Sequence, residues 1–311
     1  MTVVAVVGPT ATGKSDLAVD LALELGGEVV SADASQLYRG MDIGTAKLPP
    51  DQRRGIPHHQ LDVLEVTEEA SVAAYQAGAR ADIEAILARG AVPVLAGGSG
   101  LYVRAALDVL DIPPTDATVR AGLEAEAQLH GAAAMYERLR AADPPAAAAI
   151  EPNNVRRVVR ALEVIELTGR PFSARMPRRA FLRPTVVVGL LPPRALTDSR
   201  IEARVERMWA EGLLAEVRDL EGHGLREGRT ASRAVGYAQA LAELDGRLTR
   251  AEAVAETQRL TRRLSRRQES WFRADPRVTW VDPGERDPRR VALDLLAAAR
   301  GGPAGTSGAG E

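Results

Sequence analysis

The segment Gly8–Ser15, with the sequence GPTATGKS, restricts the fold of this chain more than any other segment. It matches the pattern G-x-x-x-x-G-K-[ST], a loop whose backbone N–H groups and following helix N-terminus hold phosphate oxygens. Such a loop joins a buried strand to a helix, and the sequence predicts a strand over Thr2–Val7 and a helix over Lys14–Leu25. We therefore predict a phosphate-binding loop in which Lys14 supplies a positive charge and Ser15 a hydroxyl ligand for Mg²⁺.

Apolar strands and helices alternate through the N-terminal part of the chain. Glu28–Ala32 and Val92–Ala96 are predicted strands, and Ala70–Arg89 has a helical period. This alternation indicates βαβ units and a parallel sheet.

The pattern changes after Pro113 and Pro114. From there to Leu167 the signals are only helical, and an apolar run at 185–190 then looks like a strand that returns to the sheet. We predict the α/β class: a P-loop NTPase-like parallel-sheet core, interrupted by an all-helical insertion domain and followed by a disordered tail. The predicted ranges are 1–112 and 185–300 for the core, 113–184 for the insertion and 301–311 for the tail.

The composition is that of an ordinary globular protein, with 45% hydrophobic and 26% charged residues. The sequence contains no cysteine, which excludes disulfides and thiolate metal sites and fits a reducing compartment. No apolar run approaches the roughly 20 residues that a membrane-spanning helix needs. We therefore expect a cytoplasmic protein that does not bind a membrane, and we expect it to be a monomer.

The basic residues are almost all arginines, and they are clustered. The net charge is −2, and Lys14 and Lys47 are the only lysines among 40 basic residues. Eight arginines stand against two glutamates between Pro152 and Arg183, and six arginines against one glutamate in Arg259–Arg273. Because local patches rather than net charge decide where a polyanion docks, both segments predict a nucleic-acid surface.

The phosphate-binding loop alone leaves its ligand open. Most such loops bind ATP or GTP, so a nucleotide kinase or a GTPase is the default reading. The sequence contains no Asn-Lys-x-Asp guanine-recognition motif. Within the first 110 residues, Glu28–Asp33 is the one apolar strand that ends in aspartate. Asp33 could be a metal ligand, or it could be a general base at the carboxyl end of a strand beside the loop.

The segment Ser31–Lys47, with the sequence SADASQLYRGMDIGTAK, resembles the signature of the tRNA dimethylallyltransferases, also called tRNA isopentenyltransferases. The resemblance covers about residues 3–282 and continues, in order, through Pro57-His58-His59, Gly97–Tyr102, Pro152-Asn153-Asn154, Arg156-Arg157, Arg160–Val164, Val235-Gly236-Tyr237, Arg266-Arg267-Gln268 and Trp271. An ordered match of this length is far more specific than the loop motif.

The resemblance implies a prenyl transfer. Dimethylallyl diphosphate would bind with its diphosphate in the loop, and N6 of the adenosine 3′-adjacent to the anticodon would attack the allylic carbon. The products would be diphosphate and N6-isopentenyladenosine, in tRNAs that read codons beginning with U. An adenine amine is a weak nucleophile, so a carboxylate that takes its proton should accelerate the reaction by roughly 10²–10⁴-fold.

By the same resemblance, residue roles can be assigned. The catalytic residues would be Asp33 as the base, Lys14, and Ser99, which stands where the family usually has a threonine. The diphosphate ligands would be Gly8, Pro9, Thr10, Ala11, Thr12, Gly13, Lys14, Ser15, Arg204 and, with a weaker match, Arg200, with Ser15 also a ligand of the Mg²⁺ cofactor.

The tRNA anticodon stem-loop is the implied partner. Its contacts would be Asp33, Ala34, Ser35, Gln36, Arg120, Arg156, Arg157, Arg160, Arg233, Gly236, Tyr237, Arg266, Arg267, Gln268, Trp271 and Arg273. Ala34 and Ala238 depart from the family, which usually has serine and arginine there. These departures remove one possible hydrogen bond to the adenine and one RNA contact.

Helical geometry supports two of the RNA-binding segments independently. On a 3.6-residue period Arg259, Arg262, Arg263, Arg266 and Arg273 share one face, with Arg267 at its edge. Leu260, Leu264 and Trp271 fall beside that stripe and are expected to face a core. In the insertion, Arg156 and Arg160 share one side of a helix, and the other side carries Val155, Val158, Leu162 and Ile165.

Three other functions remain open from the sequence. A P-loop kinase with a small acceptor would transfer phosphate from ATP. An isopentenyltransferase that uses free adenine nucleotides would need neither the insertion nor the arginine stripe. A noncatalytic RNA-binding protein would have no use for Lys14 and Asp33.

Replacing Arg156 or Arg266 by alanine should weaken tRNA binding and flatten its dependence on salt. A complex with one phosphate contact fewer displaces fewer counterions from the RNA when it forms. Filter binding of tRNA at a series of salt concentrations measures the slope. Slopes equal to that of the unchanged protein for both variants would contradict the assignment of these two helices to the RNA interface.

Overall fold

The computed structural model describes residues 1–175 and 179–301, which form two compact units. The core unit contains Met1–Asp108 and the chain from Phe181 onward, and the helical unit is Val109–Ala180. The helical unit begins and ends four residues before the predicted insertion. The boundary between the units lies where the backbones of Asp108 and Phe181 pair, and not at the prolines that follow Asp108 in the sequence. Residues 302–311 of the predicted tail lie outside the described residues.

A six-stranded sheet forms the centre of the core unit in the described part of the chain, with the order β3-β2-β4-β1-β5-β6. The strands are β1 (Val3–Val7), β2 (Gly27–Ser31), β3 (His58–His59), β4 (Val92–Gly97), β5 (Thr185–Leu190) and β6 (Val278–Val281). Every neighbouring pair is parallel, so the predicted α/β class with a P-loop-like parallel sheet is confirmed. The sequence does not predict β3 and β6, because such short runs carry little periodic signal.

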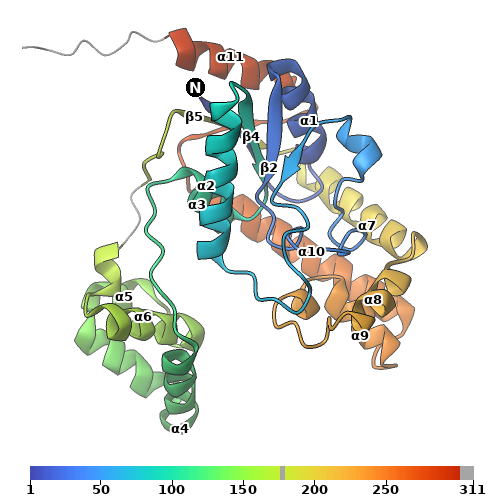
Figure 1. The fold of residues 1–311 in the computed structure, drawn as a ribbon. Coiled ribbons are helices and arrows are strands. Elements are labelled where there is room, and N and C mark those ends of the chain that lie inside the picture. Colours follow the sequence, from blue (N-terminus) through green and yellow to red (C-terminus); the bar gives the residue numbers. More distant parts are fainter. Residues whose placement is uncertain (176–178, 302–311) are drawn as a thin grey trace, which may run out of the picture. The chain divides into compact units, whose positions relative to one another are not determined.

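Helices cover both faces of the sheet (Figure 1). They are α1 (Lys14–Leu25) and α11 (Pro288–Gly301) on one face, and α2 (Val72–Ala88) and α3 (Gly100–Leu107) on the other. Leu17 and Leu21 of α1 pack with Val4 and Val6 of β1 in one apolar core. All five residues of β1 have 0% exposure, as expected for a central strand that is covered on both sides.

A second helical layer packs against the loops that follow the strands. It consists of α7 (Arg194–Ala210), α8 (Leu213–Gly222), α9 (Tyr237–Leu244) and α10 (Arg250–Arg273), and the core unit also has the 3-10 turns η1 (Pro50–Arg53) and η3 (Ala231–Arg233). The apolar core of this layer includes Ala11 from the phosphate-binding loop and Tyr38 and Met41 from the loop after β2. The layer therefore holds these loops against the sheet.

The helical unit has its own apolar core. Its elements are α4 (Ala117–Ala142), α5 (Pro144–Ala149), α6 (Val155–Thr168) and the turn η2 (Phe172–Arg175). Val158 and Leu162 are buried, and Val155 and Ile165 pack beside them, so the predicted apolar side of α6 is confirmed.

Glu163 of α6 is a buried carboxylate inside this unit, with 0% exposure. It accepts hydrogen bonds from the guanidinium groups of Arg120 and Arg160, from the Thr115 hydroxyl and from the Asp116 N–H. Burial raises the pKa of Glu163, but these hydrogen bonds outweigh burial and leave its pKa below the ordinary value. The cluster joins the start of α4 to α6.

Replacing Glu163 by alanine should destabilise the protein by about 3–5 kcal/mol, because it leaves two partly buried guanidinium groups without their carboxylate. Urea denaturation of the full chain measures the free energy of unfolding. The control is Glu137→Ala, which breaks an ion pair to Arg140 whose side chains are 57% and 64% exposed and should cost less than about 1 kcal/mol. Equal losses in the two variants would contradict this assignment.

Candidate active site

Three loops meet at the carboxyl edge of the sheet. The phosphate-binding loop Gly8–Gly13 follows β1, Asp33 follows β2, and the turn Gly97–Ser99 begins at the last residue of β4. Backbone hydrogen bonds join the last two: the Ala32 N–H donates to the Ala96 carbonyl at 2.8 Å, and the Ser99 N–H to the Ala32 carbonyl at 3.2 Å. All three loops line one cavity of about 680 Å³.

The phosphate-binding loop has a backbone that can wrap an anion. Gly8 has a φ of 136°, and a β-carbon there would lie 2.6 Å from the Leu190 carbonyl oxygen, so only glycine fits between β1 and β5. Gly13 has a φ of 92° and directly precedes α1, whose N-terminus lines the cavity. The Thr12 hydroxyl donates to the Pro9 carbonyl at 2.9 Å and holds the loop closed.

Two cations lie beside this loop. The Lys14 Nζ donates to the Pro9 carbonyl at 2.5 Å. Burial lowers the pKa of Lys14 to about 8, although the charge of Asp33 opposes this shift. Arg204 of α7 lines the cavity, with its Nη1 at 3.4 Å from the Thr10 hydroxyl. Fixed cations in a site that is partly shielded from water stabilise negative charge well.

Asp33 faces the same cavity from the end of β2. Its Oδ1 accepts a hydrogen bond from the Ser35 N–H at 3.0 Å. Burial raises the pKa of the Asp33 carboxyl, against the opposing effects of this hydrogen bond and of the Lys14 charge. A carboxylate with a raised pKa is a stronger base, which suits the removal of a proton from an amine.

Ser99 is placed beside Asp33 rather than among the residues that line the cavity. Its hydroxyl oxygen accepts a hydrogen bond from the Ala34 N–H at 3.3 Å. Ser99 therefore holds the backbone that follows Asp33, while α3 begins directly after it.

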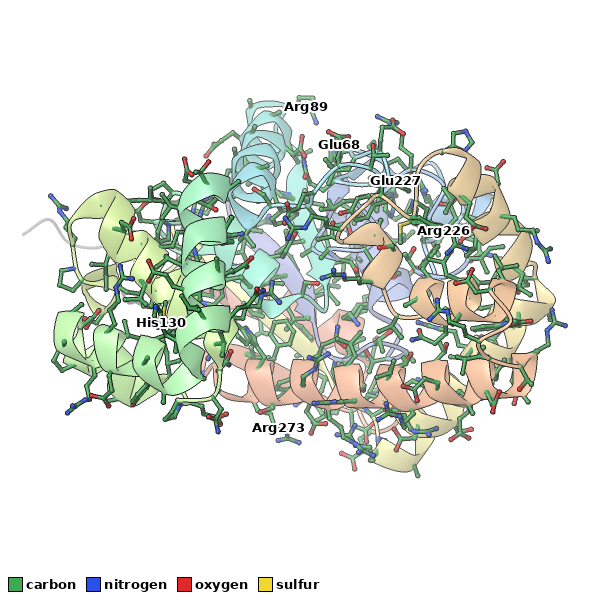
Figure 2. All side chains as sticks on the ribbon, turned by 90° about the horizontal axis from the view of Figure 1, so that it is seen from below. Glu68, Arg89, His130, Arg226, Glu227 and Arg273 are labelled. Carbon is green, nitrogen blue, oxygen red and sulfur yellow. The ribbon has the colours of Figure 1, made fainter. Side chains whose placement is uncertain are left out.

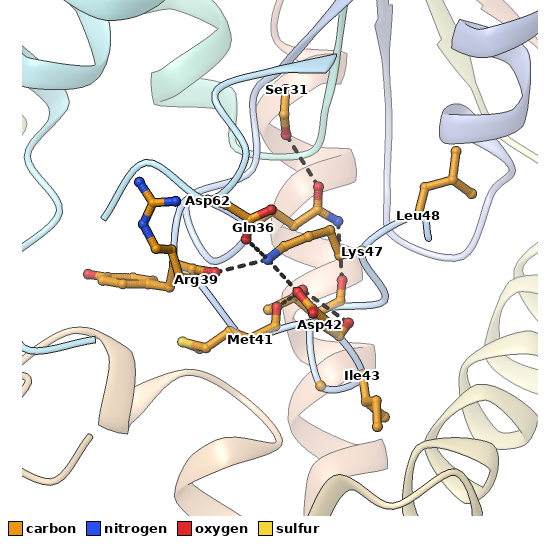
Figure 3. A network of polar contacts seen from close by, with 12 residues as sticks. Ser31, Gln36, Arg39, Met41, Asp42, Ile43, Lys47, Leu48 and Asp62 are labelled. Atoms are coloured by element: carbon orange, nitrogen blue, oxygen red, sulfur yellow. Dashed lines mark hydrogen bonds and ion pairs between the residues drawn. The ribbon is translucent and has the colours of Figure 1, made fainter. Parts of the chain in front are cut away.

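The loop between Gln36 and Lys47 lines another side of the cavity and is held by a buried ammonium group (Figure 3). The Lys47 side chain is 2% exposed, and its Nζ donates to Asp42 and Asp62 carboxylates at 2.6 Å and to the Tyr38 carbonyl at 2.9 Å. All three donors of the ammonium are satisfied. The sequence analysis assigns no role to Lys47. Its position inside the signature segment, as one of only two lysines in the chain, was a signal that could have indicated one.

Glu216 of α8 holds the same loop from the opposite direction. Its carboxylate accepts hydrogen bonds from the backbone N–H groups of Asp42, Ile43 and Gly44 at 3.1, 2.7 and 3.3 Å. The Tyr237 hydroxyl donates to it at 2.6 Å. The sequence carries no local signal for this role of Glu216, because its partners in the loop lie more than 170 residues away.

Two predicted RNA contacts, Gly236 and Tyr237, require a correction. Tyr237 has 0% exposure and Gly236 is also buried. The Tyr237 ring packs on Gly44, where a β-carbon would lie 2.5 Å from the ring. Tyr237 therefore supports the cavity loop, and of this segment Arg233 is the exposed residue.

Two predicted RNA contacts, Arg120 and Arg160, also have partners inside the helical unit. The guanidinium groups of Arg120 and Arg160 are bonded to Glu163, and Arg160 also donates to the carbonyls of Pro113 and Pro114. Both side chains stabilise the unit and remain partly exposed, at 35% for Arg120 and 28% for Arg160, so their contact with RNA stays a prediction. Arg156 and Arg157 of the same helix are exposed, which RNA contact requires.

The predicted faces of α10 need one correction. Arg266, Arg267 and Arg273 are exposed, and Figure 2 shows Arg273 pointing away from the helix. The buried face is not the predicted one of Leu260, Leu264 and Trp271: the two leucines are half-buried and Trp271 is 41% exposed. The buried residues are Ala253, Thr257, Ser265, Gln268 and Phe272. Three of these five residues are polar: the Thr257 hydroxyl donates to the Ala253 carbonyl of the same helix, and Gln268 accepts from the Thr10 N–H. Apolar periodicity cannot reveal a buried face of this composition.

Arg200 and Arg204 occupy different environments on α7. Arg204 lines the cavity, whereas Arg200 is exposed and is not among the residues that line it. Arg207, which the sequence analysis overlooks, lines the cavity together with Arg204. Its spacing of three residues from Arg204 on a helix was the available signal.

Among the described residues, no helix combines the length and the apolar character needed to cross a membrane. In the same residues, no group of three His, Cys, Asp or Glu side chains is placed to hold a metal ion. Magnesium usually takes only one or two protein ligands beside phosphate oxygens and water. The exposed Ser15 hydroxyl in the first turn of α1 fits that mode of binding.

Fold and cavity together define an α/β protein with a phosphate-binding loop and a carboxylate that faces the loop across one cavity. The profile of the family described as IPP transferase matches residues 36–275. The tRNA dimethylallyltransferase of Kineococcus radiotolerans is 62% identical over 300 residues, which cover 94% of this chain and 95% of the relative. That of Streptomyces coelicolor is 59% identical over 297 residues, with the same two coverages of 94% and 95%.

A solved structure agrees with these relatives. The full-length tRNA isopentenylpyrophosphate transferase of Bacillus halodurans has a TM-score of 0.70 and 40% identity, covering 96% of this chain and 97% of the other. The chain belongs to the IPP transferase family, and the predictions of the tRNA dimethylallyltransferase family and of a transferase enzyme are confirmed.

The predicted role of Lys14 as an anion ligand has a pH dependence: affinity for inorganic pyrophosphate should fall above pH 8, because the pKa of the Lys14 ammonium is about 8. The ammonium is present below that pH, and above it the affinity should fall by up to about tenfold per pH unit. Calorimetric titration across this range measures the effect. Lys14→Arg stays protonated and controls for the titration of pyrophosphate itself; parallel curves for the two proteins would contradict the role of Lys14.

Proposed function

We propose that this protein transfers the dimethylallyl group of dimethylallyl diphosphate to N6 of the adenosine 3′-adjacent to the anticodon, in tRNAs that read codons beginning with U. The observation that carries the proposal is the single cavity lined by the phosphate-binding loop, Lys14, Arg204 and Asp33. A diphosphate site and a base that face each other are what transfer of an allyl group to an amine requires. The names of the relatives support the same reaction.

The loop side of the cavity would stabilise the leaving group. The diphosphate accepts hydrogen bonds from loop N–H groups at the start of α1, with Lys14 and Arg204 beside it. When the allylic C–O bond breaks, negative charge collects on the diphosphate, and dipoles and cations that are already in place stabilise it. The Ser15 hydroxyl would hold a Mg²⁺ ion, which would supply further neutralisation of this charge.

The Asp33 side of the cavity would activate the acceptor. The adenine N6 forms the new C–N bond to the allylic carbon and loses a proton to the Asp33 carboxylate. Burial raises the pKa of Asp33, which makes the carboxylate a better proton acceptor. Ser99 keeps Asp33 in place through the Ala34 N–H.

The acceptor tRNA would dock on exposed arginines. Arg156 and Arg157 on α6, and Arg266, Arg267 and Arg273 on α10, are exposed and suited to phosphates and unstacked bases. An adenine inside a stacked anticodon loop cannot reach Asp33, so the base must leave its stack. The proposal also includes a monomeric enzyme that works in the cytoplasm, where its tRNA substrate is found.

Replacing Asp33 by asparagine should lower the rate of transfer by about 10²–10⁴-fold, because the amide cannot accept the proton. The affinity for tRNA should stay within about twofold, since a side chain of the same size remains. Mass analysis of nucleosides from tRNA treated with enzyme and dimethylallyl diphosphate measures the product. Asp219→Asn, on a side chain that is 77% exposed, is the matched control and should keep full activity; full activity of Asp33→Asn would refute the role of Asp33.

A further inference from the structure

Gln268 is placed where α10 meets the loops of the active site. Its side chain is nearly buried, with 9% exposure. Its Oε1 accepts a hydrogen bond from the Thr10 N–H in the phosphate-binding loop at 2.9 Å, across 258 positions of sequence. The family resemblance puts Gln268 among the RNA contacts, but here its side chain is directed at the diphosphate site, while Arg266 and Arg267 are exposed.

The same amide packs against a second active-site loop. A β-carbon on Gly98 would collide with the Gln268 Nε2, and it would lie 3.3 Å from the Gly8 carbonyl oxygen. Gly98 precedes Ser99 in the turn after β4. One side chain therefore fills the space between the phosphate-binding loop and the turn whose Ser99 holds the backbone after Asp33.

A neutral amide suits this place for two reasons. The half-buried Thr10 N–H needs an acceptor, since a donor shielded from water is costly when it is unpaired. A carboxylate acceptor would put negative charge beside the bound diphosphate and repel it. A glutamine satisfies the N–H without that charge.

We propose that Gln268 is a positioning residue: it sets the conformation of the phosphate-binding loop against the Gly97–Ser99 turn, and so the place of the diphosphate relative to Asp33. The inference rests on the proposed function for the identity of the ligand, a diphosphate. The residue acts through the Thr10 backbone and does not touch the reacting atoms.

The test uses inorganic pyrophosphate as the probe and the full chain. Gln268→Met keeps the size of the side chain but leaves the Thr10 N–H without an acceptor, and it should weaken pyrophosphate binding about tenfold in calorimetry. The value of kcat/KM for dimethylallyl diphosphate should fall by a similar factor, whereas KM for tRNA should stay within about twofold. Gln258→Met is the matched control: Gln258 lies on the same helix, donates to the Glu202 carbonyl, and should leave all three quantities unchanged.

A second variant reaches the same contact from the other side. Gly98→Ala should displace the Gln268 amide and weaken pyrophosphate binding in the same way, so it carries the test if Gln268→Met does not fold. The two substitutions break the same contact, so their effects should not add. The double variant should bind pyrophosphate within about twofold of the single variant that binds it less tightly.

The outcomes separate this inference from the proposed function. Wild-type affinity for pyrophosphate in Gln268→Met and in Gly98→Ala, or losses that simply add in the double variant, would overturn the role of Gln268. A wild-type protein that binds pyrophosphate but transfers no dimethylallyl group to tRNA would instead refute the proposed function, and the pyrophosphate measurements would still decide the role of Gln268.

Discussion

The position of β4 between β1 and β2 is the constraint on which the geometry of the active site depends. Neighbouring strands lie about 4.8 Å apart, so the ends of β1 and β2 are separated by about 10 Å. The gap separates the loop after β1, where we propose that the diphosphate binds, from the Asp33 carboxylate after β2, and the proposed transfer places the allyl group and the amine between them. The turn after β4 lies in the middle, and the hydrogen bonds from Ala32 to Ala96 and from Ser99 to Ala32 tie it to the Asp33 loop.

Polar side chains with satisfied hydrogen bonds hold the cavity loops in place, one from the loop after β2 itself and two from the distant helices α8 and α10. Lys47 and Glu216 fix the loop after β2, and Gln268 contacts the loops after β1 and β4. Buried polar groups are costly unless their hydrogen bonds are made, and then they specify one conformation. Rigid loops matter here because dipoles stabilise a transition state best when they are already in position and do not reorganise during the reaction.

Burial shifts the pKa values of Lys14 and Asp33 in opposite directions, which brings the two groups closer in basicity. In both cases removal from water disfavours the charged form, and the attraction between the two charges opposes the shift. Both shifts suit the proposed chemistry. The Asp33 carboxylate becomes a better base, and the charged form of Lys14 is stabilised when the anionic substrate binds beside it.

Much of the core was predictable from the sequence because its signals are local. The phosphate-binding loop, its strand and helix, and the carboxylate at the end of β2 are each encoded within a few consecutive residues, and the signature Ser31–Lys47 identified the family. Apolar periodicity also sufficed for the buried side of α6, since that side packs within one helical unit.

The partners of individual polar residues were decided only by the tertiary structure. Arg156 and Arg160 look equivalent on one side of a helix, yet only Arg160 meets the buried Glu163. Tyr237 and Gln268 belong to motifs that resemble RNA contacts, but both are buried against loops that lie far away in sequence: Tyr237 against Gly44 and Gln268 against Thr10. The physical reason is that a motif specifies its own backbone, whereas burial and hydrogen-bond partners depend on the order of the strands and on which helices pack over them.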